Sequence, residues 1–294
     1  MNPRRIGVIT MHTFTQLVRM KVFYFLGVFA VILLGSNLFG IQDLGRPELE
    51  GTDVLRSIRS WSLGTMTLFS VVLAVVATAL LLPKDVEDRT LYTILAKPVP
   101  RLDYLIGKFG GVLLLLFVSL AAMDLLMSGV LRYRTGLVVA EQVAAMTRQG
   151  WPADEIEAVR QETLAQGATW SLHGAVVAVF LRAAVMASIA LLISTLSTST
   201  LFTTITGFLI YFIGNFQADA RTAYFGMGLS PVERIGSLAV AVVFPDFQLF
   251  NVVDAVIEGN VFPEGRLAML LGLTAFYVIL HLFVSWIVFA DKEF

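Results

Sequence analysis

Near the middle of the chain stands the charged stretch Pro83-Lys-Asp-Val-Glu-Asp-Arg-Thr-Leu-Tyr-Thr-Ile-Leu-Ala-Lys-Pro-Val-Pro-Arg101, which separates two long apolar runs. If residues 84–96 form a helix, a rotation of about 100° per residue places its apolar and polar side chains on opposite sides. The apolar side would carry Leu91, Ile94 and Leu95, and the polar side Asp85, Arg89 and Thr93. The stretch therefore predicts a short helix with two chemically different faces.

This predicted helix is sharply bounded. Its first turn carries the carboxylates of Asp85, Glu87 and Asp88, which the positive end of the helix dipole stabilises. Pro98 and Pro100 stop the helix before the next apolar run, because proline cannot donate the backbone hydrogen bond that a continuing helix needs. We therefore expect the charged segment 84–101 to lie outside the membrane.

The composition assigns the chain to the membrane. Hydrophobic residues make up 57% of it and charged residues 15%, and the mean hydropathy is +0.79. A helix of roughly 20 apolar residues crosses a bilayer core about 30 Å thick, and the sequence contains several such runs. The absence of cysteine excludes disulfides, a cysteine nucleophile and thiolate metal ligands.

We predict an all-α integral membrane protein with six spans, which form a single transmembrane domain over residues 1–294. The first apolar run is too long for a signal peptide and lacks a cleavage site, so we interpret it as a retained span. Residues 1–20 have a polar side that includes Arg5 and His12. They indicate a helix lying in the membrane surface, or alternatively the start of the first span. The predicted spans are 21–40, 61–82, 102–131, 170–194, 200–215 and 266–290.

The first two segments between spans differ in their patterns. Residues 41–60 favour a loop that contains a short helix at 54–59. The insertion 132–169 is rich in helix formers and predicts a helical hairpin outside the membrane, interrupted at Gly150-Trp151-Pro152. This insertion is the largest polar segment between two spans.

The region 216–265 precedes the last span and is too long for a simple loop. Ser230 and Glu233 form a capping-box pattern, which indicates a helix start. The apolar run that follows, 235–244, is too short to cross the membrane. We therefore predict short re-entrant or interfacial helices at 235–244 and 250–258.

Positive charges orient the predicted spans. Six spans place both termini on one side, and that side concentrates its Lys and Arg residues in shorter segments. Because the positive-inside bias is strongest in short loops near span ends, we expect cytoplasmic termini in the cell's inner or plasma membrane. The segment 84–101 is then cytoplasmic, whereas 132–169 and 216–265 lie outside the cell.

Asp124 and Arg182 are two full charges well inside predicted spans. Each alone costs several kcal/mol in that position. Counted from the outer ends of their helices, the two depths differ by roughly 8 Å, which a long arginine side chain can cover. We predict an ion pair between the third and fourth spans, with a polar site in a substrate path as the alternative.

The predicted fifth span has one face of hydroxyls and small residues, spaced three and four positions apart. Small residues let membrane helices approach closely, and hydroxyls can bond across the contact, so the pattern favours helix packing. A role in lining a translocation path is the alternative. The residues of this face are Thr200, Thr203, Thr204, Gly207, Tyr211 and Gly214.

The sequence shows little that favours an enzyme. It contains no G-x-S-x-G and no H-E-x-x-H pattern. His281 has no carboxylate or second histidine at ligand spacing, which favours a packing role. Gly107-Lys108 is followed by Phe109 and lacks the upstream glycine of a P-loop, so we expect the chain to bind neither ATP nor a metal or cofactor.

The charged stretch and the residues after it resemble a signature of the ABC-2 type transporter permeases. The resemblance rests on Glu87-x-Arg89-Thr90-Leu91-x-x-Ile94-Leu95-x-Lys97-Pro98-Val99-x-Arg101-x-x-Tyr104-x-x-Gly107-Lys108. The segment Pro245-Asp-Phe-Gln-Leu-Phe-Asn251 and the ending Phe289-x-x-Lys292-Glu293-Phe294 extend it over essentially the whole chain. The insertion 132–169 is longer than in the compact members of that family.

The resemblance implies that this chain is the permease subunit of an ABC exporter. In that family the stretch is a coupling helix that docks on a separate cytoplasmic ATPase subunit, which binds ATP and Mg²⁺, and two permeases work as a homodimer or with a paralogue. Membrane lipids are a further expected contact, and nucleic acid is not. The docking residues that the resemblance implies are Glu87, Arg89, Thr90, Leu91, Ile94, Leu95, Lys97, Pro98 and Arg101.

Two other functions stay open. An ATP-independent carrier would show related halves with interrupted spans at matching positions, and the sequence has no such repeat. An intramembrane hydrolase needs a nucleophile and a base, and the sequence does not reveal such a pair. The nature of the cargo does not follow from the sequence.

Overall fold

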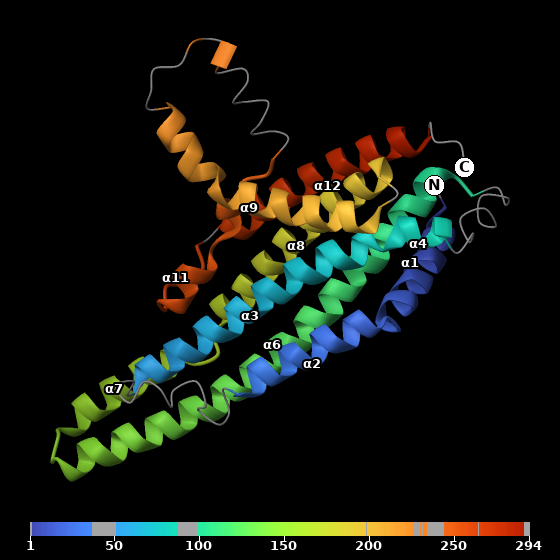
Figure 1. Cartoon of the computed structure of the whole chain (residues 1–294). Helices are drawn as coiled ribbons and strands as arrows, with labels where there is room; N and C mark the ends of the chain where they lie inside the picture. Colours follow the sequence, from blue (N-terminus) through green and yellow to red (C-terminus); the bar gives the residue numbers. More distant parts are fainter. Residues whose placement is uncertain are drawn as a thin grey trace.

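The computed structural model describes residues 2–36, 51–87, 99–197, 199–225, 230, 232–233, 244–263 and 265–290. Within these residues the regular structure is all helical, in agreement with the predicted class (Figure 1). The long helices are α1 (Pro3–Val18), α2 (Lys21–Ser36), α3 (Thr52–Ala79), α6 (Arg101–Arg148), α8 (Trp170–Leu196), α9 (Thr200–Phe225) and α12 (Arg266–Ala290). The short ones are α4 (Leu81–Glu87), α7 (Ala153–Ala165), the 3-10 helix η2 (Phe247–Phe250) and α11 (Val253–Ile257).

Four stretches of the described chain are long and apolar enough to cross a membrane, namely Thr52–Pro83, Arg101–Arg148, Ala153–Leu196 and Arg266–Ala290. They contain the predicted second, third, fourth and sixth spans. Helix α2, at 16 residues, and helix α9 are not among these four stretches. The total of six spans therefore stays a prediction.

Helix α8 lies at the centre of the bundle, between α3 and α12 (Figure 1). It packs against both of them and against α6 and α9. Its buried residues include many alanines, which let neighbouring helices approach closely. The apolar part of α8 is mostly buried, whereas that of α12 is mostly exposed. Helix α8 is therefore the core of the bundle, and the described residues leave most of the apolar surface of α12 uncovered.

Helix α6 continues far beyond the predicted third span. It is one helix of 48 residues, about 72 Å long, whereas a bilayer core is about 30 Å thick. Most of α6 beyond residue 131 therefore lies outside a bilayer core, and the helix does not end where the span is predicted to end. The C-terminal part of α6 packs against α7 and forms an arm at one end of the molecule (Figure 1). The predicted interruption at residues 150–152 separates these two helices, and Gly150 has a φ of 76° there, a conformation that favours glycine.

Two other boundaries differ from the prediction. Helix α3 begins at Thr52, so residues 54–59 are its first turns and not a separate helix in a loop. Helix α9 continues to Phe225, beyond the predicted end of the fifth span at Asn215. In both cases the helix continues through polar residues. Their low hydropathy excludes these residues from a predicted span, but polar residues can still form a helix.

The capping box predicted before the last span is present. The backbone amide of Ser230 donates to the Glu233 carboxylate at 2.8 Å, and the amide of Glu233 donates back to the Ser230 hydroxyl at 3.4 Å. The hydrogen bonds from Ser230 hold the pKa of Glu233 below its usual value. The predicted helix 235–244 lies outside the described residues apart from its last position, whereas η2 and α11 occupy the region of the predicted helix 250–258.

Candidate functional site

Asp85, Tyr104 and Lys108 form a buried polar cluster at the two ends of the charged stretch. The Lys108 ammonium lies 2.5 Å from the Asp85 carboxylate, and the Tyr104 hydroxyl donates to the same carboxylate oxygen at 2.5 Å. All three side chains are almost fully buried. Asp85 belongs to α4, whereas Tyr104 and Lys108 belong to the first turns of α6. The cluster therefore joins the two ends of the stretch to each other.

The local sequence explains why Tyr104 and Lys108 lie on the same side of α6. Helix α6 begins directly after Pro100, and residues four apart on a helix lie on the same side, so Tyr104 and Lys108 both face α4. The ammonium group also lies 5.7 Å from the centre of the Tyr104 ring. A buried ion pair is stable only when its remaining polar atoms are also bonded, as the hydroxyl does here for Asp85.

Arg101 connects the start of α6 to the end of α12. Its guanidinium donates to the backbone carbonyl of Phe289 at 2.7 Å and to that of Ala290. The last carbonyls of a helix lack partners within the helix and carry partial negative charge, so a cation stabilises them. The Phe289 ring stacks on Tyr104, with centroids 5.9 Å apart. We call Asp85, Arg101, Tyr104, Lys108 and Phe289 the anchor cluster.

Helix α1 packs along the same part of α6. The Thr10 hydroxyl donates to the Gly107 carbonyl at 3.2 Å. A Cβ atom added to Gly111 would lie only 2.5 Å from the Cβ of Thr13, so the two helices approach each other through the glycines of α6. The predicted surface helix therefore lies beside the anchor cluster.

The structure describes the two ends of the predicted docking segment. Glu87 is the last residue of α4, and Arg101 is the first residue of α6. The other predicted docking residues lie outside the described residues. They are Arg89, Thr90, Leu91, Ile94, Leu95, Lys97 and Pro98.

The pairing of Asp85 does not follow from the sequence. A helical wheel places Asp85 on the polar side with Arg89, and the residue is 3% exposed. The wheel gives the side of the helix but not the neighbour of that side, which is α6 with Lys108. The spacing of Tyr104 and Lys108 was a usable signal for a polar site, although their partner could come only from the fold.

Asp124 and Arg182 do not bind each other, so the predicted ion pair is wrong. Asp124 lies 2.8 Å from the Nδ1 atom of His173 on α8. Arg182 donates to the side-chain oxygen of Asn215 on α9. The two charges have compatible depths, but depth does not determine the side of the helix to which a side chain points, and each finds a nearer partner.

Aromatic rings and amides surround the Arg182 guanidinium. Its central carbon lies 4.9 Å from the centre of the Tyr211 ring and 5.6 Å from that of Phe247, distances at which a cation is attracted to a ring. The Asn215 amide is held in turn by the Tyr211 carbonyl at 2.8 Å. Arg182 and Tyr211, both predicted as intramembrane polar residues, are therefore part of one site.

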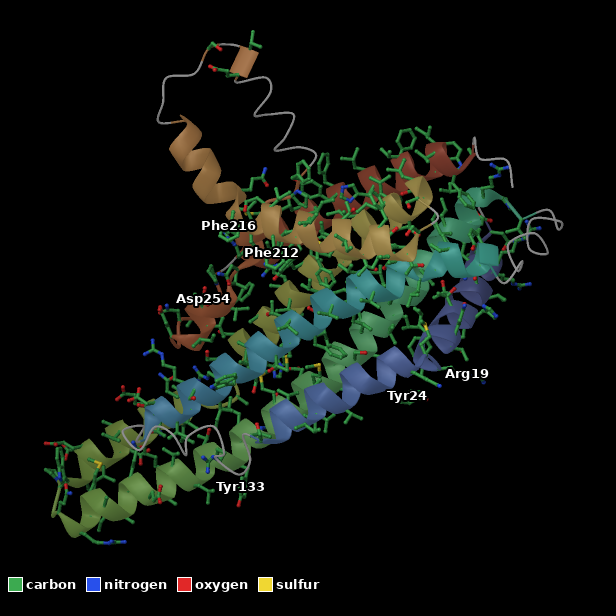
Figure 2. The ribbon with its side chains drawn as sticks, viewed as in Figure 1. Arg19, Tyr24, Tyr133, Phe212, Phe216 and Asp254 are labelled. Atoms are coloured by element: carbon green, nitrogen blue, oxygen red, sulfur yellow. The ribbon has the colours of Figure 1, made fainter. Side chains whose placement is uncertain are left out.

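A cavity of about 450 Å³ lies beside Arg182, between α3, α8, α9 and the segment 251–254. Its walls are mainly apolar and include Leu68 and Val71 of α3 and Phe212 of α9. Asp254 also lines it, and Figure 2 labels Phe212 and Asp254 on neighbouring parts of the molecule. We call this space the Arg182 cavity.

Thr203 and Thr204 do not line the Arg182 cavity. Their hydroxyls donate to carbonyls of their own helix, those of Ser199 at 3.1 Å and Thr200 at 2.8 Å. A Cβ atom added to Gly207 on the same helix would lie 2.9 Å from the Val75 side chain of α3. This geometry favours the helix-packing interpretation of the face.

Ser188 and His281 form a pair that the sequence did not reveal. The Ser188 hydroxyl lies 2.8 Å from the Nδ1 atom of His281, and it donates to the Val185 carbonyl at 2.7 Å. The His281 ring stacks on Tyr277. Both Ser188 and His281 are buried and neither lines the Arg182 cavity, so the geometry is that of a packing contact between α8 and α12. Across the described part of the chain, no group of three His, Asp or Glu residues could hold a metal ion.

A comparison with protein families gives a match over most of the chain. A family model described as "ABC-2 family transporter protein" matches residues 8–219, which is well over half of the chain. The match includes the charged stretch, Arg182 and Tyr211. No curated protein matches the sequence.

Proposed function

This chain belongs to the ABC-2 transporter family, and from that premise we propose that it is the permease of an exporter driven by a separate ATPase subunit. Members of the family are multi-pass membrane components that work with an ABC ATPase. The long apolar helices of this chain agree with that role. We propose in particular that transport is outward and that it is coupled to ATP hydrolysis by the partner subunit.

The anchor cluster is the observation that supports coupling. A docking segment can pass the movement of a partner to the membrane only if its ends are firmly attached to the spans. Here Asp85 and Lys108 attach both ends of residues 88–98 to one buried ion pair, and Arg101 attaches α6 to α12. A force on the segment would therefore move α6 and α12 together.

We further propose that two copies of this chain, or one copy and a paralogue, form the transport unit in the cell membrane, with cytoplasmic termini. Helices α9 and α12 leave large apolar side chains exposed, among them Phe212, Phe276 and Phe283. In a membrane these side chains face lipid or a second permease. Two bundles facing each other would enclose a path that one bundle cannot enclose.

The test of the proposed function compares two substitutions in the charged segment. Leu91→Asp should abolish association with the ATPase subunit, because it puts an unpaired charge into an apolar contact. Thr93→Asp, on the opposite side of the helical wheel, should do much less. Both positions are in the middle of the predicted helix, so a general loss of helicity would affect them alike.

Co-purification of the ATPase with the tagged full-length permease is the measurement. Retention of the ATPase by Leu91→Asp together with its loss from Thr93→Asp would show that the helix docks by its polar face. If both variants retain it, the segment is a solvated connector and the coupling proposal fails.

A further inference from the structure

Arg182 is a buried cation whose charge no carboxylate balances in the part of the chain that the structure describes. Arg182 is 8% exposed, and no acidic side chain among the described residues lies within ion-pair distance of its guanidinium. A guanidinium has five N–H donors, and one of them bonds to Asn215. The Nε atom is buried without a partner. Because a buried charge without a counter-charge is unfavourable, an anionic group bound beside Arg182 would stabilise it.

The cavity beside this cation reaches the apolar outer surface of the helix bundle. Leu68 of α3 and Phe212 of α9 line it, and both are more than half exposed on the outer surface of apolar helices, where acyl chains would lie. Its volume of about 450 Å³ is that of a typical small-molecule site. An occupant with a polar head and an apolar tail therefore matches both the buried and the exposed parts of the cavity.

Asp254 adds a second charge to the same cavity. It is exposed, and its carboxylate accepts a hydrogen bond from the neutral amide of Asn251 at 2.7 Å. A headgroup with only negative charge would be repelled by Asp254. A headgroup with both a phosphate and an amine is complementary to Arg182 and Asp254 together.

We propose that the Arg182 cavity binds a zwitterionic phospholipid-like amphiphile. Its phosphate contacts the Arg182 guanidinium, its amine contacts the Asp254 carboxylate, and its acyl chain lies against Leu68 and Phe212. That this amphiphile is also the substrate of the exporter rests on the proposed function. The binding itself does not depend on transport.

The experiment is native mass spectrometry of the full-length chain with three lipids of identical acyl chains. Phosphatidylethanolamine should bind about tenfold more tightly than phosphatidylglycerol or phosphatidylcholine, because only its primary ammonium can donate to Asp254. The water-soluble headgroup glycerophosphoethanolamine distinguishes a headgroup site from an amphiphile site. Its binding should be at least tenfold weaker than that of the intact lipid.

Substitutions assign the contacts. Arg182→Gln should weaken phosphatidylethanolamine binding about tenfold or more, whereas Asp254→Asn should reduce the preference for phosphatidylethanolamine over phosphatidylglycerol. Arg160→Gln is the control, because it removes an exposed arginine of α7 far along the chain from the cavity. If Arg182→Gln does not fold, the exposed position of Asp254 keeps the selectivity test available.

Two results would overturn the proposal. One is equal binding of phosphatidylethanolamine by the wild type and Arg182→Gln, and the other is equal affinity for the three lipids. Glycerophosphoethanolamine bound as tightly as the lipid would reject an amphiphile. The lipid-binding assay does not include the ATPase, so it tests the cavity separately from coupling. If both Leu91→Asp and Thr93→Asp retain the ATPase while lipid binding persists, the coupling proposal fails and the cavity assignment stands.

Discussion

Lys108 is a full positive charge on a side chain that is 2% exposed, and it is stable there because Asp85 and Tyr104 surround it. The three residues come from both ends of the charged stretch. The energetic cost of burying the ammonium and the carboxylate is recovered only when both are present in the same geometry. A single change on either side should therefore have a larger effect than the loss of one contact.

Lys108→Met should lower the free energy of unfolding by about 3–5 kcal/mol, since it leaves the Asp85 carboxylate buried without a counter-charge. Tyr104→Phe should cost less, about 1–3 kcal/mol, because the ion pair remains. The double variant Asp85→Asn with Lys108→Met should lose less free energy of unfolding than the sum of the losses in the two single variants. Unfolding in detergent is measured for the wild type, Asp85→Asn, Lys108→Met, the double variant and Tyr104→Phe. Strictly additive losses for Asp85→Asn and Lys108→Met would contradict the pairing.

At the scale of elements, the contact between α1 and α6 depends on glycine. A Cβ atom added to Gly111 would lie 2.5 Å from the Thr13 side chain and 3.0 Å from the Thr10 carbonyl, so the helices would have to separate. By contrast, the same helix carries Gly129, where an added Cβ atom meets nothing within 4 Å. The two glycines therefore separate the effect of helix propensity from that of packing.

Gly111→Ala should increase hydrogen–deuterium exchange over residues 3–18, because it pushes α1 away from α6. Gly129→Ala should leave this exchange unchanged and stabilise α6 slightly, since alanine is favoured over glycine by about 1 kcal/mol in a helix interior. Equal exchange in α1 for both variants would mean that the close glycine contact does not hold α1 in place.

At the scale of the whole molecule, Arg59 joins three parts of the chain that are far apart in sequence. It is buried near the start of α3 and donates to the Gln166 side chain at 3.0 Å, to the Gly167 carbonyl at 3.2 Å and to the Val256 carbonyl at 3.4 Å. These acceptors follow α7 or lie at the end of α11. A cation there stabilises the C-terminal ends of these helices, which carry partial negative charge.

Arg59→Gln should destabilise the protein by about 3 kcal/mol, because hydrogen bonds to a charged group contribute about 1.5–3 kcal/mol each and several are lost together. Exchange at residues 165–170 should rise with it. Arg56→Gln, an exposed arginine three positions earlier on the same helix, should stay within about 0.5 kcal/mol of the wild type. A similar loss in both variants would indicate a general effect of charge and not of the Arg59 contacts.

The sequence by itself determined the helical membrane class, the family and the places where four apolar stretches lie. The start of α8 at Trp170 and both ends of α12 were predicted to the residue, because the hydropathy of a run and the thickness of a bilayer are enough to locate such a helix. The extent of α3, α6 and α9 was not, because a helix can continue from lipid into water without any change in its backbone bonds. Hydropathy reports the solvent of a residue and not its hydrogen-bond pattern.

The tertiary structure alone decided which buried charges meet. Asp85 binds Lys108, Asp124 contacts His173, and Arg182 lies beside aromatic rings. Depth along the helices had instead suggested an ion pair between Asp124 and Arg182. Depth and helical period describe each helix separately. The partner of a side chain depends on how neighbouring helices are rotated about their axes and how far apart they lie, and packing sets both only when all the helices are assembled.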